Sequence, residues 1–291
     1  MRIRFWVPVR VLDGGSCVGT YGPALAEQSP LRDKSTQSDS RGANQVVQED
    51  RMFCSGSFPK PHRFATVARS GWLAGPRRPT LDALMKLDLA AGVDVQNDRL
   101  ELQVIGWGLD SQSYVLDYQM LWGETSHSKV WQDLDDYLKR RYSRDTLPSL
   151  PIACVAIDSG YQTTQVYNYV KVRRGRRIFA VKGQSQPGKS IAGRPTVAGR
   201  QRIQLFPAGV DSAKEVIFQW LQVEAEGPGY IHFPNTCDEE YFKQLTAEKR
   251  VIKYVKGNKT IVWIKQYKRN ESLDCFVYAL VALNILQPNL E

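Results

Sequence analysis

The sequence predicts an α/β fold: a mixed β-sheet with helices on its faces. Three strand-like runs, at 89–96, 100–108 and 113–119, are separated by links of a few residues, and such links join antiparallel neighbours. From residue 128 onward, helical and strand-like segments alternate, which is typical of strands covered by helices. The 291 residues are 42% apolar, enough for the core of one large domain.

The elements follow from their periodicity. Residues 100–105 alternate, with Leu100, Leu102 and Val104 on one face, as in a half-buried strand. Val130, Leu134 and Leu138 recur at helical spacing and predict a helix at 128–142. The other expected elements are a short helix at 81–87, a strand at 152–157 after a loop bounded by Pro148 and Pro151, a helix at 162–172, strands at 177–182 and 203–206 with a Gly/Pro/Arg-rich loop between them, a helix at 211–222, a strand at 229–233, a helix at 238–247, a hairpin of 251–256 and 259–265 turning at Gly257-Asn258, and a helix at 271–286.

Residues 1–80 differ from the rest of the chain. They have no sustained period, the stretch 28–50 is polar, and 59–79 is rich in Pro, Arg and Gly. We expect a disordered or aberrant segment without catalytic groups at 1–80, and a single domain at 81–291.

Several classes of protein are disfavoured by composition. No run reaches the 18 or so apolar residues of a membrane span, and the N-terminus lacks a signal core. Five scattered cysteines without Cys-x-x-Cys spacing disfavour disulfides and zinc, and the three histidines lie far apart. We expect a cytoplasmic protein with no membrane partner.

Four acidic residues suggest a metal site. Asp94 and Asp158 each end an apolar, strand-like run, where an uncompensated carboxylate is costly. Glu271 and Asp274 share one face at the start of the last helix. Oxygen ligands without His or Cys suit two Mg²⁺ or Mn²⁺ ions, as in enzymes that cut phosphodiesters. The alternatives are a satisfied buried Asp94, helix capping by Asp158, and a favourable helix dipole for the other two.

A basic block indicates a polyanionic partner. The net charge of +9 is concentrated in residues 171–202, which contain no acidic residue. As candidate DNA contacts we name Lys171, Arg173, Arg174, Arg176, Arg177, Lys182, Lys189, Arg194, Arg200 and Arg202. The alternative is a solvated basic loop.

Residues 183–190 match the phosphate-loop pattern G-x-x-x-x-G-K-[ST]. That loop needs a helix that begins at the Lys-Ser pair. Here three helix breakers follow within 191–199, so we expect Lys189 to contact nucleic acid rather than a nucleotide.

The order β-β-β-α-β-α-β fits a ribonuclease H-like sheet, in which the first strand lies beside the fourth. That arrangement would place Asp94 and Asp158 on neighbouring strands. Several motifs resemble the large terminase subunit of lambda-type tailed phages, the GpA family, over residues 88–287. They include Gly-Trp-Gly at 106–108, Ile-Asp-Ser-Gly at 157–160 and Asn-Glu-Ser-Leu-Asp-Cys at 270–275, with further likeness at 91–101, 180–188, 228–234 and 241–248.

The resemblance implies the C-terminal endonuclease domain of that family, which cuts concatemeric double-stranded DNA during packaging. It implies Asp94, Asp158 and Asp274 as metal ligands, with Glu271 competing for the third place and Lys182 near the scissile phosphate. The implied partners are the small terminase subunit and the portal, in a bacterial host cell.

The family's packaging ATPase would precede this domain, but residues 1–80 carry no phosphate loop. We therefore expect a truncated chain without the motor, either a prophage remnant or the product of a mis-started reading frame. Two alternatives stay open: a catalytically inactive DNA-binding prophage remnant, and an ATP-binding protein that uses the 183–190 loop.

Overall fold

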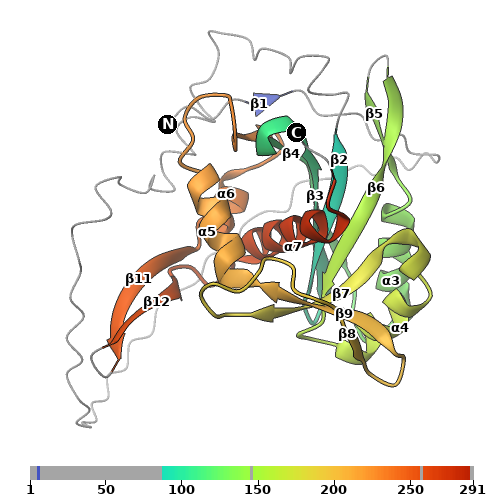
Figure 1. The fold of residues 1–291 in the computed structure, drawn as a ribbon. Helices are drawn as coiled ribbons and strands as arrows, with labels where there is room; N and C mark the ends of the chain where they lie inside the picture. The colour runs from blue at the N-terminus through green and yellow to red at the C-terminus, as the bar shows by residue number, and fades with distance from the viewer. Residues whose placement is uncertain (1–4, 7–86, 145–146, 256–257, 289–291) are drawn as a thin grey trace, which may run out of the picture.

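A ten-stranded mixed sheet forms the centre of the molecule (Figure 1). The computed structural model describes residues 5–6, 87–144, 147–255 and 258–288. Across the sheet the strands follow the order β1 (Phe5–Trp6), β10 (Ile231–Pro234), β4 (Ser113–Trp122), β3 (Arg99–Trp107), β2 (Asp88–Val95), β6 (Leu147–Asp158), β7 (Ile178–Gln184), β9 (Ile203–Gly209) and β8 (Thr196–Ala198), with β5 (Arg141–Arg144) paired to β6. β11 (Glu248–Val255) and β12 (Asn258–Lys265) form a separate antiparallel hairpin.

The predicted fold class is confirmed. β2, β3 and β4 are consecutive antiparallel neighbours. β2 also pairs in parallel with β6, which is the fourth strand of this series when the short β5 is left out. β6, β7 and β9 continue in the same direction. The ends of β2, β6, β7 and β9 therefore meet at one edge of the sheet, in the ribonuclease H-like strand order.

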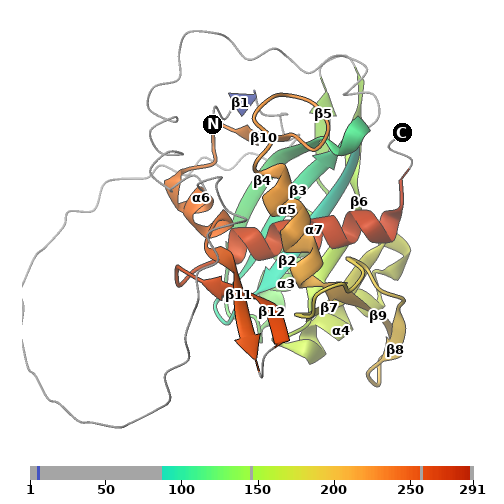
Figure 2. The same cartoon turned by 60° about the vertical axis from the view of Figure 1, so that its left-hand side comes forward.

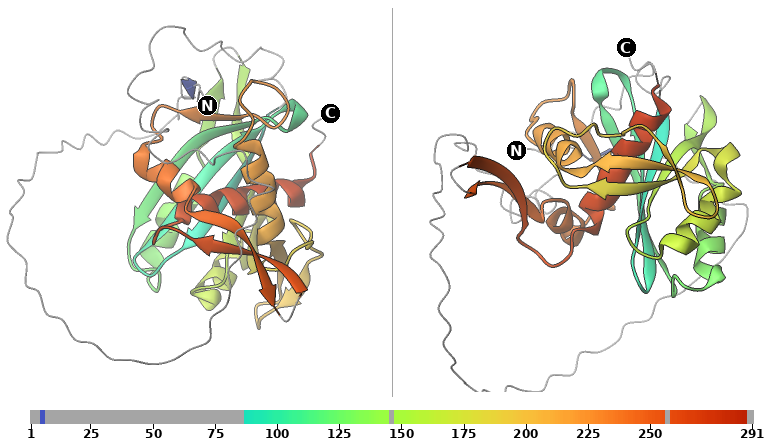
Figure 3. Two further views of the ribbon diagram at one scale, coloured as in Figure 1. Left: turned by 90° about the vertical axis from the view of Figure 1, so that its left-hand side faces the viewer. Right: turned by 60° about the horizontal axis from the view of Figure 1, so that its bottom comes forward.

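Helices cover both faces of the sheet, as Figures 2 and 3 show. α3 (Ser128–Tyr137) and α4 (Thr163–Lys171) pack on one face, against Leu89, Ala91 and Val93 of β2. The opposite face packs against α5 (Val210–Trp220), α6 (Glu239–Leu245) and α7 (Glu271–Leu286). Short 3₁₀ turns lie at Leu109–Ser111 and Arg174–Arg176.

α7 crosses the middle of the sheet and is itself enclosed. Its residues are apolar around most of the helix, and those from Leu273 to Leu283 are almost all buried between the sheet and the other two helices. A helix that is apolar all round is expected at such a buried position. No helix among the described residues is long and apolar enough to cross a membrane.

Two predictions around residue 140 are wrong. The helix expected to reach 142 ends at Tyr137, and β5 pairs with the start of β6, which begins at Leu147 rather than 152. Tyr142 is buried, with its hydroxyl 3.1 Å from that of Tyr137, and this contact favours the strand. Residues 147–151 extend beyond the pairing with β2, so Pro148 and Pro151 remove no hydrogen bond to that strand.

Other differences are small. A short strand, β8, lies within the expected loop before residue 203. The hairpin is present, with Asn258 paired to Val255, whereas Gly257 of the expected turn lies outside the described residues. The expected helix at 81–87 lies, except for Leu87, outside the described residues. So does the segment 1–80 apart from β1, which pairs with β10.

Candidate active site

Asp94 and Asp158 lie side by side at the edge of the sheet. Val93 of β2 is the register partner of Ile157 of β6, so each aspartate is the next residue on its strand. Side chains alternate along a strand. Ala90 and Ala156 belong to the core beneath α5 and α7, and the same alternation directs Asp94 and Asp158 toward this helical face. The predicted proximity of the two strands is confirmed.

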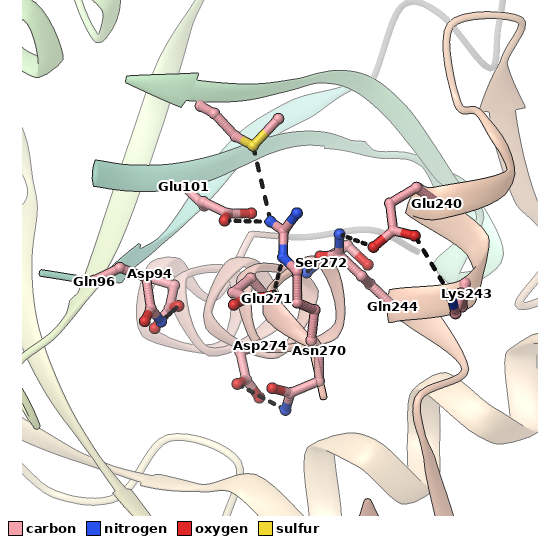
Figure 4. A network of polar contacts seen from close by, with 12 residues as sticks. Asp94, Gln96, Glu101, Glu240, Lys243, Gln244, Asn270, Glu271, Ser272 and Asp274 are labelled. Carbon is pink, nitrogen blue, oxygen red and sulfur yellow. Dashed lines mark hydrogen bonds and ion pairs between the residues drawn. The ribbon is translucent and has the colours of Figure 1, made fainter. Parts of the chain in front are cut away.

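Gly92 brings α7 against β2. A Cβ atom at Gly92 would lie 2.0 Å from the carbonyl oxygen of Cys275 and 2.4 Å from the amide nitrogen of Ala279, both backbone atoms of α7. Only glycine permits this approach, which places the first turn of α7, with Asp274, over the end of β2. Figure 4 shows Asp94 and Asp274 around this end of the helix.

The three carboxylates interact electrostatically. Burial, reinforced by the charges of Asp274 and Asp158, raises the pKa of Asp94 to about 7. Burial also raises the pKa of Asp274 to about 6; Lys214 opposes this rise, while Glu248 and Asp158 add to it. The pKa of Asp158 is raised by burial, although hydrogen bonds from Gly160, Tyr278 and Ser159 limit the rise. All three carboxyl groups therefore carry an electrostatic cost when ionised.

Each carboxylate is also held by neighbouring groups. Gln96 donates from Nε2 to Oδ2 of Asp94 at 2.5 Å. Asn270 donates from Nδ2 to Oδ2 of Asp274 at 2.9 Å, and the Lys214 ammonium lies 4.0 Å from Oδ1 of Asp274. These contacts fix the orientation of the carboxylates without neutralising Asp94.

The donor set fits a hard divalent cation. It consists of carboxylate oxygens whose mutual repulsion a cation would relieve, and oxygen ligands are those that Mg²⁺ and Mn²⁺ prefer. Within the described residues, however, no group of three or more His, Cys, Asp and Glu side chains is arranged as a ready-made metal cage. Small movements of side chains, including release of Asp274 from Lys214, would be needed to bind an ion with all three.

Glu271 lies in a different environment. Its carboxylate is 3.2 Å from Arg99 and 3.2 Å from Arg269. Both arginines also bind the fully buried Glu101, at 2.6 and 2.7 Å, and Tyr118 donates to Glu101 as well. Two arginines thus satisfy Glu271, which favours Asp274 as the third carboxylate.

Sequence reasoning missed Glu101 and this network. Glu101 is the register partner of Asp94, so a fifth acidic residue lies next to the four predicted ones. The available signal was the pair Arg99 and Glu101 at alternate positions of a strand whose other residues, apart from Gln103, are apolar. Sequence reasoning also missed the buried Lys214, which pairs with Glu248 at 2.8 Å.

The basic block does not form one surface. Residues 171–177 precede β7, and Arg200 and Arg202 precede β9, so they lie toward the edge opposite to Asp158. Arg173 and Arg176 pair with Asp135 of α3, at 2.7 and 2.5 Å. Lys189 and Arg194 lie near the end of β9, because Gly209 donates to Ser190 and Gly193 donates to Pro207.

Lys182 is exposed near the end of β7, and its charge lowers the pKa of Asp158 slightly against the larger effect of burial. Because side chains alternate along a strand, Lys182 lies on the same face of the sheet as Ala180, which packs beneath α3 and α4 rather than α7. No helix begins at Lys189, because residues 185–195 contain only turns and one isolated bridge. The segment 183–190 is therefore not followed by the helix that a phosphate loop needs.

Comparison with known proteins identifies the class of this domain. The chain belongs to the family described as "Terminase large subunit gpA, endonuclease domain", whose model matches residues 84–291. The large terminase subunit of Escherichia phage lambda is 37% identical over 205 residues, which are 68% of this chain and 32% of that protein. The corresponding subunit of Enterobacteria phage P21 is 30% identical over 208 residues, with the same coverage. The chain thus spans about a third of the length of these curated relatives.

A solved structure is also similar. It is described as the g2p (large terminase) nuclease domain from the bacteriophage SPP1 with bound Mn, and it is 13% identical with a TM-score of 0.34. The match covers 66% of this chain and 85% of that one.

Proposed function

We propose that this chain is a divalent-metal-dependent endodeoxyribonuclease that cuts concatemeric phage DNA during genome packaging. The observation that carries the proposal is the placement of Asp94, Asp158 and Asp274 at the ends of adjacent strands and the facing turn of α7, in a member of a terminase endonuclease family.

In this proposal Asp94 and Asp158 would hold one Mg²⁺ or Mn²⁺ ion, and Asp94 and Asp274 would hold a second. Bound cations would lower the pKa of a coordinated water and offset the charge on the leaving oxygen. Gln96 orients Asp94 through its 2.5 Å hydrogen bond, and Tyr278 together with the backbone of Gly160 orients Asp158. Lys214 balances part of the charge of Asp274, with its ammonium 4.0 Å from Oδ1.

The basic residues have unequal roles in this proposal. Lys182, Lys189 and Arg194, near the carboxylate edge, hold the DNA backbone close to the scissile phosphate. Lys171, Arg174, Arg177, Arg200 and Arg202 are exposed farther away and contribute a weaker, longer-range attraction. Arg173 and Arg176 contribute least, because Asp135 already pairs with both.

The test is cleavage of supercoiled plasmid by the whole chain in Mn²⁺ and in EDTA. We expect cutting only with metal. Asp94→Asn should lose more than about a hundredfold in rate, since removal of a direct ligand should exceed the effect of second-shell changes, while DNA binding is retained. Asp136→Asn, on α3 with a side chain 75% exposed, is the matched control and should cut like the parent.

Cutting by Asp94→Asn at the parental rate would refute the proposed site. A parent chain that binds DNA but never cuts it would favour the alternative of an inactive DNA-binding remnant. The small terminase subunit and the portal are the partners we propose in the host cytoplasm.

A further inference from the structure

The β11–β12 hairpin is a second basic element, which projects from the body of the protein (Figures 1 and 3). Residues 249–268 contain seven Lys and Arg and no Asp or Glu, within only 20 residues. These are Lys249, Arg250, Lys253, Lys256, Lys259, Lys265 and Lys268. Their density exceeds that of the basic block at 171–202, and such a density is expected where a polyanion binds.

One face of the hairpin packs on the body of the protein. Arg250 lies 3.4 Å from Glu215 of α5, and its register partner Trp263 contacts Phe218 with ring centroids 5.0 Å apart. Alternation along β11 turns Lys249, Val251 and Lys253 to the other face. Both lysines are exposed, and no ion pair joins either of them to another described residue. The outer face therefore carries positive charge that the described part of the chain leaves unneutralised.

The base of the hairpin is linked to the candidate active site. Glu248 and Lys265 are register partners where the two strands begin and end. Asn270 donates from Nδ2 to Glu248 at 2.8 Å and to Asp274 at 2.9 Å, while Lys265 donates to Oδ1 of Asn270 at 2.6 Å. The hairpin thus extends directly from the residues that hold Asp274.

We propose that the outer face of the β11–β12 hairpin binds the phosphates of duplex DNA and guides the duplex to the carboxylates. The guidance of the duplex to the carboxylates rests on the proposed function. A strand of eight residues spans about 27 Å, or roughly eight base pairs of duplex. A two-stranded ribbon also fits the width of the major groove, which lets lysines on one face reach the backbone on either side.

The test compares two double variants with the same loss of charge. Lys249→Gln/Lys253→Gln changes the outer face of the hairpin, and Lys129→Gln/Lys139→Gln changes two exposed lysines across the sheet, one on α3 and one just after it. Binding to duplex DNA is measured in EDTA, so nothing is cut, over a series of salt concentrations. Circular dichroism and the thermal midpoint verify that all chains fold alike.

For the hairpin variant we expect the slope of log K against log salt to fall by about 1.8, and affinity at about 0.1 M salt to weaken on the order of 50-fold. The α3 variant should bind like the parent. An unchanged affinity and salt slope in the hairpin variant would overturn the proposal. Loss of cleavage with intact binding would overturn it too, because the hairpin would then only support the site. Hairpin-dependent binding without any cleavage in Mn²⁺ would refute the nuclease function and leave this proposal standing.

Discussion

Among single residues, Asp94 carries an ionisation cost that can be measured without DNA. Its folded-state pKa of about 7 lies above the ordinary 3.8, so the folded protein binds this proton more tightly than the unfolded chain does. Asp94 therefore destabilises the fold least below about pH 4, where its carboxyl group is protonated in both the folded and the unfolded state. The free energy of unfolding falls as the pH rises from there toward 7. Asn resembles the protonated carboxyl group, so in EDTA at pH 8 Asp94→Asn should be more stable than the parent by on the order of 2–4 kcal/mol. Urea denaturation at pH 8 and pH 4.5 checks this; an advantage equal at both pH values would contradict it.

Glu101 and Asp98 offer a second comparison, because both bind Arg99. Glu101 is fully buried between two arginines, whereas the Asp98 side chain is 58% exposed. Glu101→Gln leaves buried positive charge uncompensated and should destabilise the fold by about 3 kcal/mol. Asp98→Asn should cost less than about 1 kcal/mol, since solvent screens the exposed pair. Denaturant unfolding of the two variants measures the loss in free energy of unfolding for each. Equal losses would show that the buried network contributes no more than a surface pair.

At the level of elements, the contact between Gly92 and α7 should tolerate no side chain. The Cβ of Gly92→Ala would collide with helix backbone, which cannot rotate away as a side chain can. We expect destabilisation of about 3 kcal/mol or more and loss of cleavage, because α7 must shift together with Asp274. Gly227→Ala is the control, since nothing lies within 4 Å of its added Cβ. Thermal melts and plasmid cleavage give the two measurements, and a fully active Gly92→Ala would contradict the proposed role of α7.

The loop at 183–190 should bind no ATP. Without a helix after Lys189, its backbone amides lack the arrangement that holds phosphates. Calorimetric titration of the whole chain with Mg²⁺-ATP should show no heat of binding. Measurable affinity that disappears in Lys189→Ala would revive the ATP-binding alternative.

The elements also show what the sequence can and cannot predict. Period-2 runs such as 100–105 and the uniformly apolar 152–157 were predictable because burial on a sheet requires them. β5 was not, because Arg141–Arg144 has no apolar alternation and forms only by pairing with the start of β6. Asp94 and Asp158 stood out as charges in apolar strands, whereas Glu101 and Lys214 depend on partners remote in sequence.

For the whole molecule, divalent metal should stabilise the fold in a pH-dependent way. Protons compete with the cation for Asp94 and Asp274, whose pKa values are about 7 and 6. At pH 8 these groups are ionised, so Mn²⁺ should raise the thermal midpoint clearly, by an amount equivalent to about 2.7 kcal/mol at a hundred times its Kd. At pH 5.5 the increase should be much smaller. Differential scanning fluorimetry with Mn²⁺ and with EDTA tests this, and an equal increase at both pH values would argue against binding by these carboxylates.

The basic block at 171–202 is divided between two edges of the sheet. A run of charge in the sequence looks like one surface, but the chain passes from one edge of the sheet to the other between 177 and 202. The hairpin at 249–268 gathers its charge on one short ribbon, although it is shorter than the run at 171–202. Topology, and not charge density along the chain, decides which cations can reach one duplex.

The crossing of α7 over β2 also determines when during folding the three carboxylates come together. Asp94 and Asp274 are 180 positions apart (274 − 94), and α7 follows every other described element in the chain. Contacts between such distant segments form late, because a long loop must close first. During synthesis, the first two carboxylates leave the ribosome long before the third. An emerging chain therefore holds an incomplete set, and we expect cutting to begin only after α7 has docked on the sheet.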